Sequence, residues 1–587
     1  HSGAWLRELM RGKDTLSNRL ASDYFSCDGE PLGERQSKWL NDDYVKFIRF
    51  AQWKIESTGH GVLAFITNRN YIDNITFRGM RQALTTAFDS IYVLDLHGDA
   101  LGGDAAASGL ADENVFDITK GVAITIFVRS KGKRKETPKV AYASLRGPRG
   151  GERVELNGKI LKGAGKDGWL RTNSVGTIKW RKVKPEAPYY LFRPENEAAR
   201  RVYRKIFVGV DELFKFGSSG FVAGYKEIAV DYSAAAVLEK FRQFIFPEAR
   251  LSSEDVKAQF GLADREKWTV AEARAKLRSD PDWQDSVVPY LARPFDLRNV
   301  LYKDYFLIRS VRKVQQHMLH GDNLALLVSR QTIAPFRHVF ASRTVATFNV
   351  LDNAGRHGAG PLFPLYTHYG SIEGKSEEVL SLGAKKEHNL SLEVVKNLAD
   401  GLGLTFLPAG LGDLRKTFGP EDIFGYVYAI LHASVFRADF SVQLKTGFPR
   451  VPLAPSKKSF AKLSRLGTML VNLHTDQITP SEAASFPKAG DNIVRKIKFT
   501  LPHSGSKKGQ IRINEDQYFE NVPSAVWKHQ IGRYQVCFQW LKERADRKLS
   551  YDEIVAFSRL VGVLSDGLAV IAKIDDELLL RPLWTSA

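Results

Sequence analysis

Apolar residues in the first 130 positions switch between helical and strand spacing. Residues 43–55 and 77–88 repeat apolar side chains every three or four positions, which predicts two amphipathic helices. Residues 61–67, 90–96 and 122–128 are short continuous apolar runs of strand length, and the first suits a strand covered on both faces. The order helix, strand, helix, strand, loop, strand predicts an open α/β sheet.

A polar loop with an aromatic residue precedes the last of these strands. Asp112, Glu113 and Asn114 are loop-forming residues, Phe116 follows them, and Gly121 marks a turn directly before the strand. Phe116 is therefore either an exposed group beside the sheet or a core residue at the strand's edge.

Taken together, these segments resemble the part of γ-type N6-adenine DNA methyltransferases that follows their Asn-Pro-Pro-Tyr motif, most closely that of single-polypeptide type I (type ISP) restriction-modification enzymes. The resemblance implies the C-terminal half of a Rossmann-like methyltransferase sheet, followed by a mixed α+β target-recognition domain. It rests on Leu32-Gly-Glu-Arg35, Val62-Leu-Ala-Phe-Ile-Thr-Asn68, Phe77-Arg-Gly-Met-Arg81, Tyr92-Val-Leu-Asp-Leu-His97 and residues 112–128.

The resemblance continues in order through the rest of the chain. It implies a methyltransferase portion at 1–135, a basic β-rich connecting segment at 136–188 and a DNA target-recognition domain with a helical end at 189–587. In that last part, Ser550 with Glu553 three positions later predicts a capped helix that runs to about Leu564. The matching segments there are residues 288–302, 323–331, 420–432 and 448–453.

Four cations of the recognition region are candidate DNA contacts. Arg293, Arg298 and Arg330 carry guanidinium groups that can grip phosphate or guanine, although an arginine here can instead pair with Asp296. Near Gly220 the family often carries a Gly-Ile-x-Thr-Gly-Arg-Asp-like turn, which this chain lacks. Lys226 could replace the charge of that arginine but not its fork.

The resemblance also implies what a complete enzyme needs. Neither Asn-Pro-Pro-Tyr nor Asp-Pro-Pro-Tyr occurs in the 587 residues, and the first residue is His1. The expectation is a fragment whose S-adenosylmethionine site, with any nuclease and ATPase regions, lies upstream. Phe116 would stack on the adenine turned out of the duplex, while the fragment alone would bind DNA without methylating it. An alternative donor loop at residues 91–103 leads into a long loop instead of a helix.

Charge independently favours a nucleic-acid partner. The chain carries a net charge of +19, and residues 129–184 hold 17 basic and 4 acidic residues, a net +13. Grouped cations attract phosphates and release counterions, which makes double-stranded DNA the expected partner. Within this segment the run Lys131, Lys133, Arg134 and Lys135 is a candidate DNA contact, with a solvated linker as the alternative.

Other features set limits on the class of protein. Cys27 and Cys537 are far apart, and neither they nor the 13 histidines have metal-ligand spacing. No metal site is therefore expected, and the two separated cysteines fit a reducing cytoplasm. No uninterrupted apolar run reaches membrane-spanning length. Two other functions stay open, namely a DNA-binding specificity subunit whose catalytic half is a separate chain, and an RNA methyltransferase.

Overall fold

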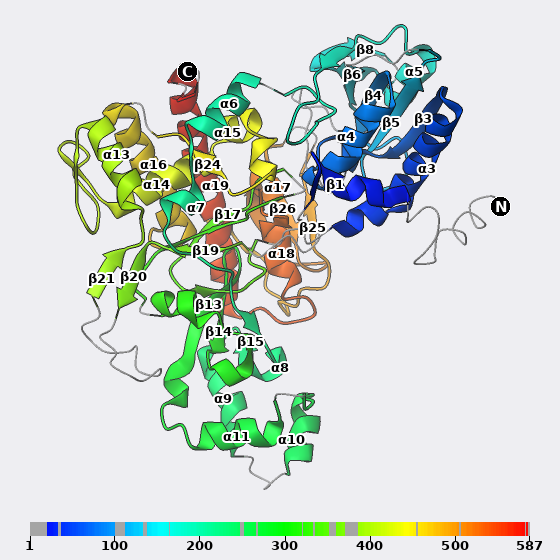
Figure 1. The fold of residues 1–587 in the computed structure, drawn as a ribbon. Coiled ribbons are helices and arrows are strands. Elements are labelled where there is room, and N and C mark those ends of the chain that lie inside the picture. Colours follow the sequence, from blue (N-terminus) through cyan, green and yellow to red (C-terminus); the bar gives the residue numbers. More distant parts are fainter. Residues whose placement is uncertain are drawn as a thin grey trace. The chain divides into compact units, whose positions relative to one another are not determined.

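The computed structural model forms two compact units, residues His1–Glu197 and Ala198–Ala587, which we call the first and the second unit (Figure 1). The structure describes residues 20–32, 37–99, 112–132, 138–163, 165–195, 197–246, 252–265, 268–319, 321–332, 335–351, 360–369, 385–453, 456–503, 506–581 and 583–584.

The first unit is built on one mixed sheet of order β3-β5-β4-β6-β7-β8, with β9 also paired to β6. β4 and β6 are parallel, whereas β5 is antiparallel to both of its neighbours, β3 and β4. The predicted α/β class is confirmed. The strands are β3 (Gly61–Asn68), β4 (Ser90–His97), β5 (Val122–Arg129), β6 (Lys139–Arg146), β7 (Arg153–Leu156), β8 (Lys159–Lys162) and β9 (Arg181–Val183).

Helices cover the sheet because its strands alternate their apolar side chains between two faces. Ile91 and Val93 of β4 belong to the cluster that α3 (Asp43–Thr58) and α4 (Arg78–Ala87) complete. Leu94 and Leu96 face the other side, with Trp169 of α5 (Gly165–Thr172). All five helices and strands predicted between residues 43 and 128 are confirmed.

The prediction that residues 61–67 are covered on both faces is wrong. Side chains of β3 alternate in exposure, with Val62 65% and Ile66 47% exposed. β3 is an edge strand of the sheet, and among the described residues only β5 pairs with it. No other described part of the first unit therefore pairs with the outer edge of this apolar strand, and side chains on one of its faces are exposed.

The segment 136–188 is not a separate connector in this structure. β6 pairs directly with β4, and β7, β8 and β9 extend from β6. The basic segment is β-structured, as its sequence predicts, and belongs to the same sheet as β3 to β5. The compact first unit ends at Glu197.

The second unit combines several small sheets with a helical core. Gly467 shows how closely two of its helices approach, because a Cβ there would lie 1.7 Å from the carbonyl oxygen of Gly425. The principal elements are β12 (Val230–Asp231), β13 (Val287–Arg293), β14 (Asp296–Leu301) and β18 (Val345–Ala346) in one sheet, β16 (Ala325–Val328), β17 (Val339–Ser342) and β19 (Leu362–Pro364) in another, β25 (Lys498–Thr500), β26 (Lys508–Arg512) and β27 (Tyr518–Pro523) in a third, and the helices α8 (Lys226–Ala229), α9 (Ala234–Ile245), α13 (Leu392–Leu402), α14 (Pro420–His432), α16 (Lys457–His474), α18 (Val536–Lys542) and α19 (Tyr551–Leu580).

Helix α19 begins as predicted and ends later. Ser550 and Glu553 form the expected capping box, but the helix continues to Leu580 and not to about Leu564. Its N-terminal half packs Phe557 into one core cluster, and its C-terminal half packs Ile574 into a second cluster. The helix is long because it serves two cores.

By length and composition, α19 is the one helix among the described residues that could cross a membrane. Half of its most apolar stretch is buried inside the second unit. A core helix of a globular protein has the same properties.

Candidate nucleic-acid interface

Phe116 lies on a turn that leaves its ring 45% exposed. The buried side chain of Asn114 holds this turn: its carbonyl oxygen accepts a hydrogen bond from the Phe116 N–H at 2.9 Å. Its amide donates to the carbonyl oxygens of Gly98 and Lys120 at 3.1 and 2.7 Å. The start and end of the turn are thus tied together beneath the exposed aromatic ring.

A buried lysine anchors the same turn to the sheet. Lys166 of α5 is fully buried, and its Nζ donates to the carbonyl oxygens of Leu96 and Glu113 at 2.7 and 2.6 Å. The Nζ also lies 2.7 Å from the Asp112 carboxylate, which in turn accepts backbone N–H groups of Gly98 and Gly147. Burial lowers the pKa of Lys166, and Asp112 opposes that change.

Arg149 ties the Phe116 turn to the segment that leads into β7. Its Nε donates to the carbonyl oxygen of Asn114 at 3.0 Å, and its guanidinium pairs with Asp117 at 2.8 Å. Its backbone N–H donates to the Glu113 carboxylate at 2.8 Å. The turn and the β7–β8 hairpin are therefore one continuous structure.

A second buried ion pair lies under the turn, at the end of β4. Arg69 donates two hydrogen bonds to Asp95 at 2.8 and 2.7 Å, and Tyr142 donates a third at 3.1 Å. Burial would raise the pKa of Asp95, but Arg69 holds it well below its usual value. Burial lowers the pKa of His97 to about 3, so this histidine is neutral at pH 7.

This arrangement suits a surface that receives a flat ligand. Phe116 and the neighbouring Ile118, which is 50% exposed, project from a turn whose polar groups are fixed by buried partners. An aromatic ring held in water on a rigid support can stack on a base without first ordering its loop. Exposure decides between the two sequence-based alternatives for Phe116, because the ring is not part of the core.

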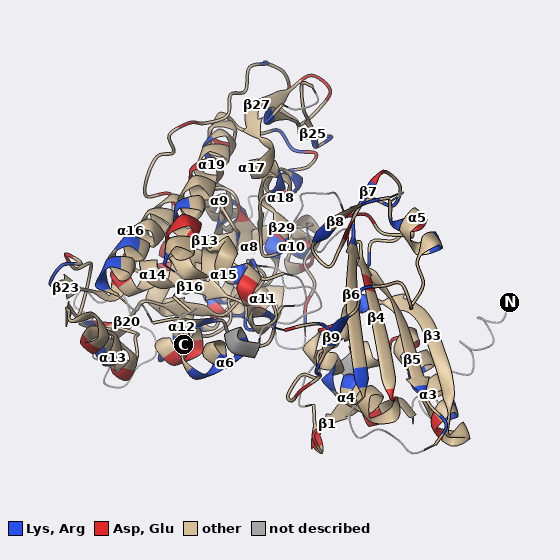
Figure 2. Ribbon diagram, turned by 90° about the horizontal axis from the view of Figure 1, so that it is seen from above, with Lys and Arg blue, Asp and Glu red and all other residues tan. Residues whose placement is uncertain are grey.

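Basic residues predicted to contact DNA in the first unit are only partly visible. Lys131 is exposed in the turn after β5, whereas Lys133, Arg134 and Lys135 lie outside the described residues. Other exposed cations lie on β8 and β9 (Figure 2).

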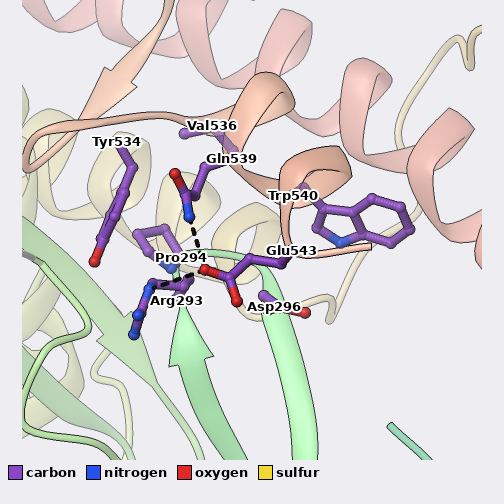
Figure 3. A pocket seen from close by; sticks show the side chains of 8 residues that line it. All are labelled: Arg293, Pro294, Asp296, Tyr534, Val536, Gln539, Trp540 and Glu543. Carbon is purple, nitrogen blue, oxygen red and sulfur yellow. Dashed lines mark hydrogen bonds and ion pairs between the residues drawn. The ribbon is translucent and has the colours of Figure 1, made fainter. Parts of the chain in front are cut away.

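Arg293 borders a narrow pocket between the β13–β14 hairpin and α18 (Figure 3). Its guanidinium lies 5.2 Å from the centre of the Tyr534 ring and 3.8 Å from the Glu543 carboxylate, with one hydrogen bond to the carbonyl oxygen of Ala292. The side chain keeps 25% exposure. Arg293 is therefore held in place but can still reach a ligand.

Arg298 lies on the same hairpin and is engaged more fully. Its guanidinium donates to Asp296 at 3.0 and 2.6 Å and to Glu543 at 2.7 Å. Burial would lower the pKa of Arg298, but Asp296 and Glu543 raise it above its ordinary value. A DNA contact by Arg298 stays a prediction, and it would have to compete with these intramolecular pairs.

Asp296 also pairs with a second buried arginine, Arg544, at 2.9 Å. Arg544 is 4% exposed, and it additionally contacts Glu553 at 3.2 Å and the carbonyl oxygen of Trp540 at 3.0 Å. The network joins a hairpin near residue 296 to helices that begin some 240 residues later.

Lys226 and Arg330 lie on other elements of the second unit. Lys226 begins α8 and is exposed, whereas the exposed Arg330 follows β16 with its guanidinium 5.9 Å from the centre of the Phe448 ring. The structure thus brings Arg293 and Arg298 together on one hairpin and leaves the other two on separate elements. Their DNA contacts stay predictions.

Sequence reasoning missed the residues that support these side chains. Lys166 lies in the segment at 136–188, where no single residue was predicted to belong to a site. Glu543 and Arg544 directly follow α18, outside the segments on which the resemblance rests. The sequence signal for these residues was the presence of acidic and basic side chains that could form ion pairs. The partners could not be matched from the sequence, because they lie 54 to 248 residues apart.

Comparisons with known proteins agree with this architecture. A family model described as "Type ISP C-terminal specificity domain" matches residues 212–559, which lie within the second unit and make up more than half of the chain. The chain therefore belongs to the Type ISP C-terminal specificity domain family. No curated protein matches the chain.

Solved structures resemble the chain over nearly its whole length. The ATP-dependent Type ISP restriction-modification enzyme LlaBIII bound to DNA has TM-score 0.60 and 18% identity, the DrdV–DNA complex 0.59 and 20%, and a nuclease-deletion mutant of the Type ISP enzyme LlaGI in complex with a DNA substrate mimic 0.58 and 17%. They cover 95%, 97% and 94% of this chain, which spans only 35%, 54% and 42% of theirs.

Proposed function

We propose that this chain recognises a DNA sequence for a restriction-modification or phage-defence system in the cytoplasm. The specificity-domain match over residues 212–559 carries this proposal. The net charge of +19 supports a phosphate-rich partner, and the similar solved structures are DNA complexes. In this proposal the partly exposed Arg293 and the exposed Arg330 are available to contact DNA, whereas Arg298 is engaged with Asp296 and Glu543.

The first unit is proposed to be the C-terminal half of an adenine-N6 methyltransferase domain. The free edge of β3 and its exposed Val62 and Ile66 support a sheet that continues into another segment. Phe116 then stacks on an adenine turned out of the duplex, because N6 cannot be reached inside the stack. The chain alone is proposed to bind DNA without methylating it.

In this proposal the methyl donor, S-adenosylmethionine, would supply the transferred methyl group from a site in the other half of that domain, and nuclease and ATPase regions would lie outside this chain. The turn at Gly98 does not fit that donor. A Cβ placed on Gly98 would lie 2.4 Å from the Cα of Asn114, so the chain itself fills the space beside this backbone. No residue of this chain is assigned to the donor.

A second candidate is a specificity subunit whose catalytic half is a separate polypeptide. The free edge of β3 fits either a covalent or a separate partner. The specificity-domain match favours DNA over RNA as the substrate.

Selection from a random duplex library tests the proposed recognition. The purified chain should enrich one sequence at roughly 150 mM salt, and binding at roughly 50 mM should be tighter and less selective because phosphate contacts strengthen without base contacts. Single-stranded DNA and an RNA duplex library serve as controls. Enrichment of no sequence at either salt concentration, or preference for the RNA library, would contradict the proposal.

A further inference from the structure

Two cations of the β7–β8 hairpin lie side by side without a neutralising acid. Arg153 of β7 is the direct cross-strand partner of Lys162 of β8. Both side chains are exposed, and among the described residues neither forms an ion pair or hydrogen bond. Like charges directly opposite each other destabilise a hairpin, so stability of the hairpin does not explain this pair.

The two cations border an open hollow at the base of the hairpin. The hollow has a volume of about 520 Å³ and is lined by Gly151, Glu152, Arg153, Lys162 and Gly163. Two of its lining residues are joined by a hydrogen bond from the Gly163 N–H to the Glu152 carbonyl oxygen at 2.7 Å. The two cations outweigh the single carboxylate of Glu152, and glycines allow close approach of a ligand.

The hairpin is firmly attached to the turn that carries Phe116. Val154 and Leu156 of β7 are buried in the sheet's core beside Trp169. Four residues before Arg153, Arg149 bonds to Asn114 and Asp117 within that turn. The cation pair and the exposed aromatic ring therefore belong to segments that hydrogen bonds and core packing link to each other.

We propose that Arg153 and Lys162 bind a backbone phosphate of the DNA strand that flanks the base received by Phe116. This inference rests on the proposed function. Phosphate contacts fix the register of a protein on DNA and carry no sequence information. The pair thus positions the duplex next to Phe116, while the second unit reads the sequence.

The salt dependence of DNA binding measures this contact directly. With Arg153→Gln and Lys162→Gln together in the full chain, the slope of log K against log salt should become shallower by about 1, because one neutralised phosphate contributes roughly 0.9. Affinity should fall by a similar factor on all duplex sequences. The unfolding midpoint should not fall, since the substitution removes a repulsive pair.

A charge-matched control is Lys54→Gln with Lys396→Gln, two exposed cations on α3 and α13. This control should leave the slope unaltered. An unaltered slope in the Arg153/Lys162 variant, with normal DNA binding by the parent chain, would overturn the inference alone. Absence of DNA binding by the parent chain would instead overturn the proposed function.

Inorganic phosphate distinguishes DNA from a free anion as the ligand. The full chain is titrated with inorganic phosphate, and binding is followed by calorimetry. If the pair serves the DNA backbone, the Kd for inorganic phosphate should be about 1 mM or weaker, because an isolated phosphate contact contributes at most about 4 kcal/mol. Tight phosphate binding that the double variant loses, together with an unaltered salt slope, would assign the hollow to a free anion and overturn the proposal.

Discussion

Replacing Lys166 by methionine is expected to lower the free energy of unfolding of the first unit by about 3–5 kcal/mol, the cost of breaking a buried pair by removing one partner. The substitution keeps the volume of the side chain but leaves the Asp112 carboxylate buried without its cation. It also leaves the carbonyl oxygens of Leu96 and Glu113 without the donor that each has at 2.7 and 2.6 Å. Chemical denaturation measures the loss, and amide hydrogen exchange localises it.

The same amide exchange experiment reports on the Phe116 turn. Protection of the Phe116 N–H, which donates to Asn114, should fall together with that of Gly98 and Gly147, which donate to Asp112. Lys162→Met, on the exposed strand β8, is the matched control and should change stability by no more than about 0.5 kcal/mol. A loss below about 1 kcal/mol for Lys166→Met would show that the buried amine does not hold the turn.

Replacing Asp296 by asparagine is expected to destabilise the second unit by about 3–5 kcal/mol. Asp296 is 1% exposed, and its charge compensates the guanidiniums of Arg298 and Arg544. Asparagine retains the shape of the side chain but leaves two largely buried cations with less negative charge. Thermal or denaturant unfolding, followed by a probe in the second unit, measures the effect.

The control for Asp296→Asn is the same change at Asp304. Asp304 is more than half exposed and lies 3.5 Å from Arg312, so its loss should cost no more than about 1 kcal/mol. Equal effects of the two substitutions would contradict a structural role for the buried network. Such a result would also mean that Arg298 is not committed to the network and is available for the predicted DNA contact.

Sequence patterns identified the helices and strands between residues 43 and 128 because each depends on local spacing. Residues 43–55 and 77–88 form helices, and three apolar runs form strands, since their periods match the geometry of each structure. The coverage of β3 was predicted wrongly for a physical reason. A continuous apolar run indicates a strand suited to burial on two faces, but it does not show whether a covering element is present in the chain.

The candidate site was only half visible in the sequence. Phe116 could be selected because a polar loop and a turn flank it, whereas its support depends on Lys166, 50 positions later. Similarly, the fork of Arg298 was evident, and pairing with Asp296 was foreseen as an alternative. Glu543 and Arg544, which complete that network, directly follow α18 and lie some 245 residues away in the sequence. Such long-range pairs leave no periodic signal.

The most direct test of the account uses a set of duplexes of the selected sequence, each with 2-aminopurine in place of a different adenine. With the parent chain, emission at one position should rise on binding, because that base leaves the stack and is received beside Phe116. Phe116→Ala should abolish the rise and weaken binding by about 1–3 kcal/mol, the value of one base–aromatic stack. The same increase in emission with both proteins, or at no position with either, would contradict the central claim that this chain joins sequence recognition to capture of an adenine.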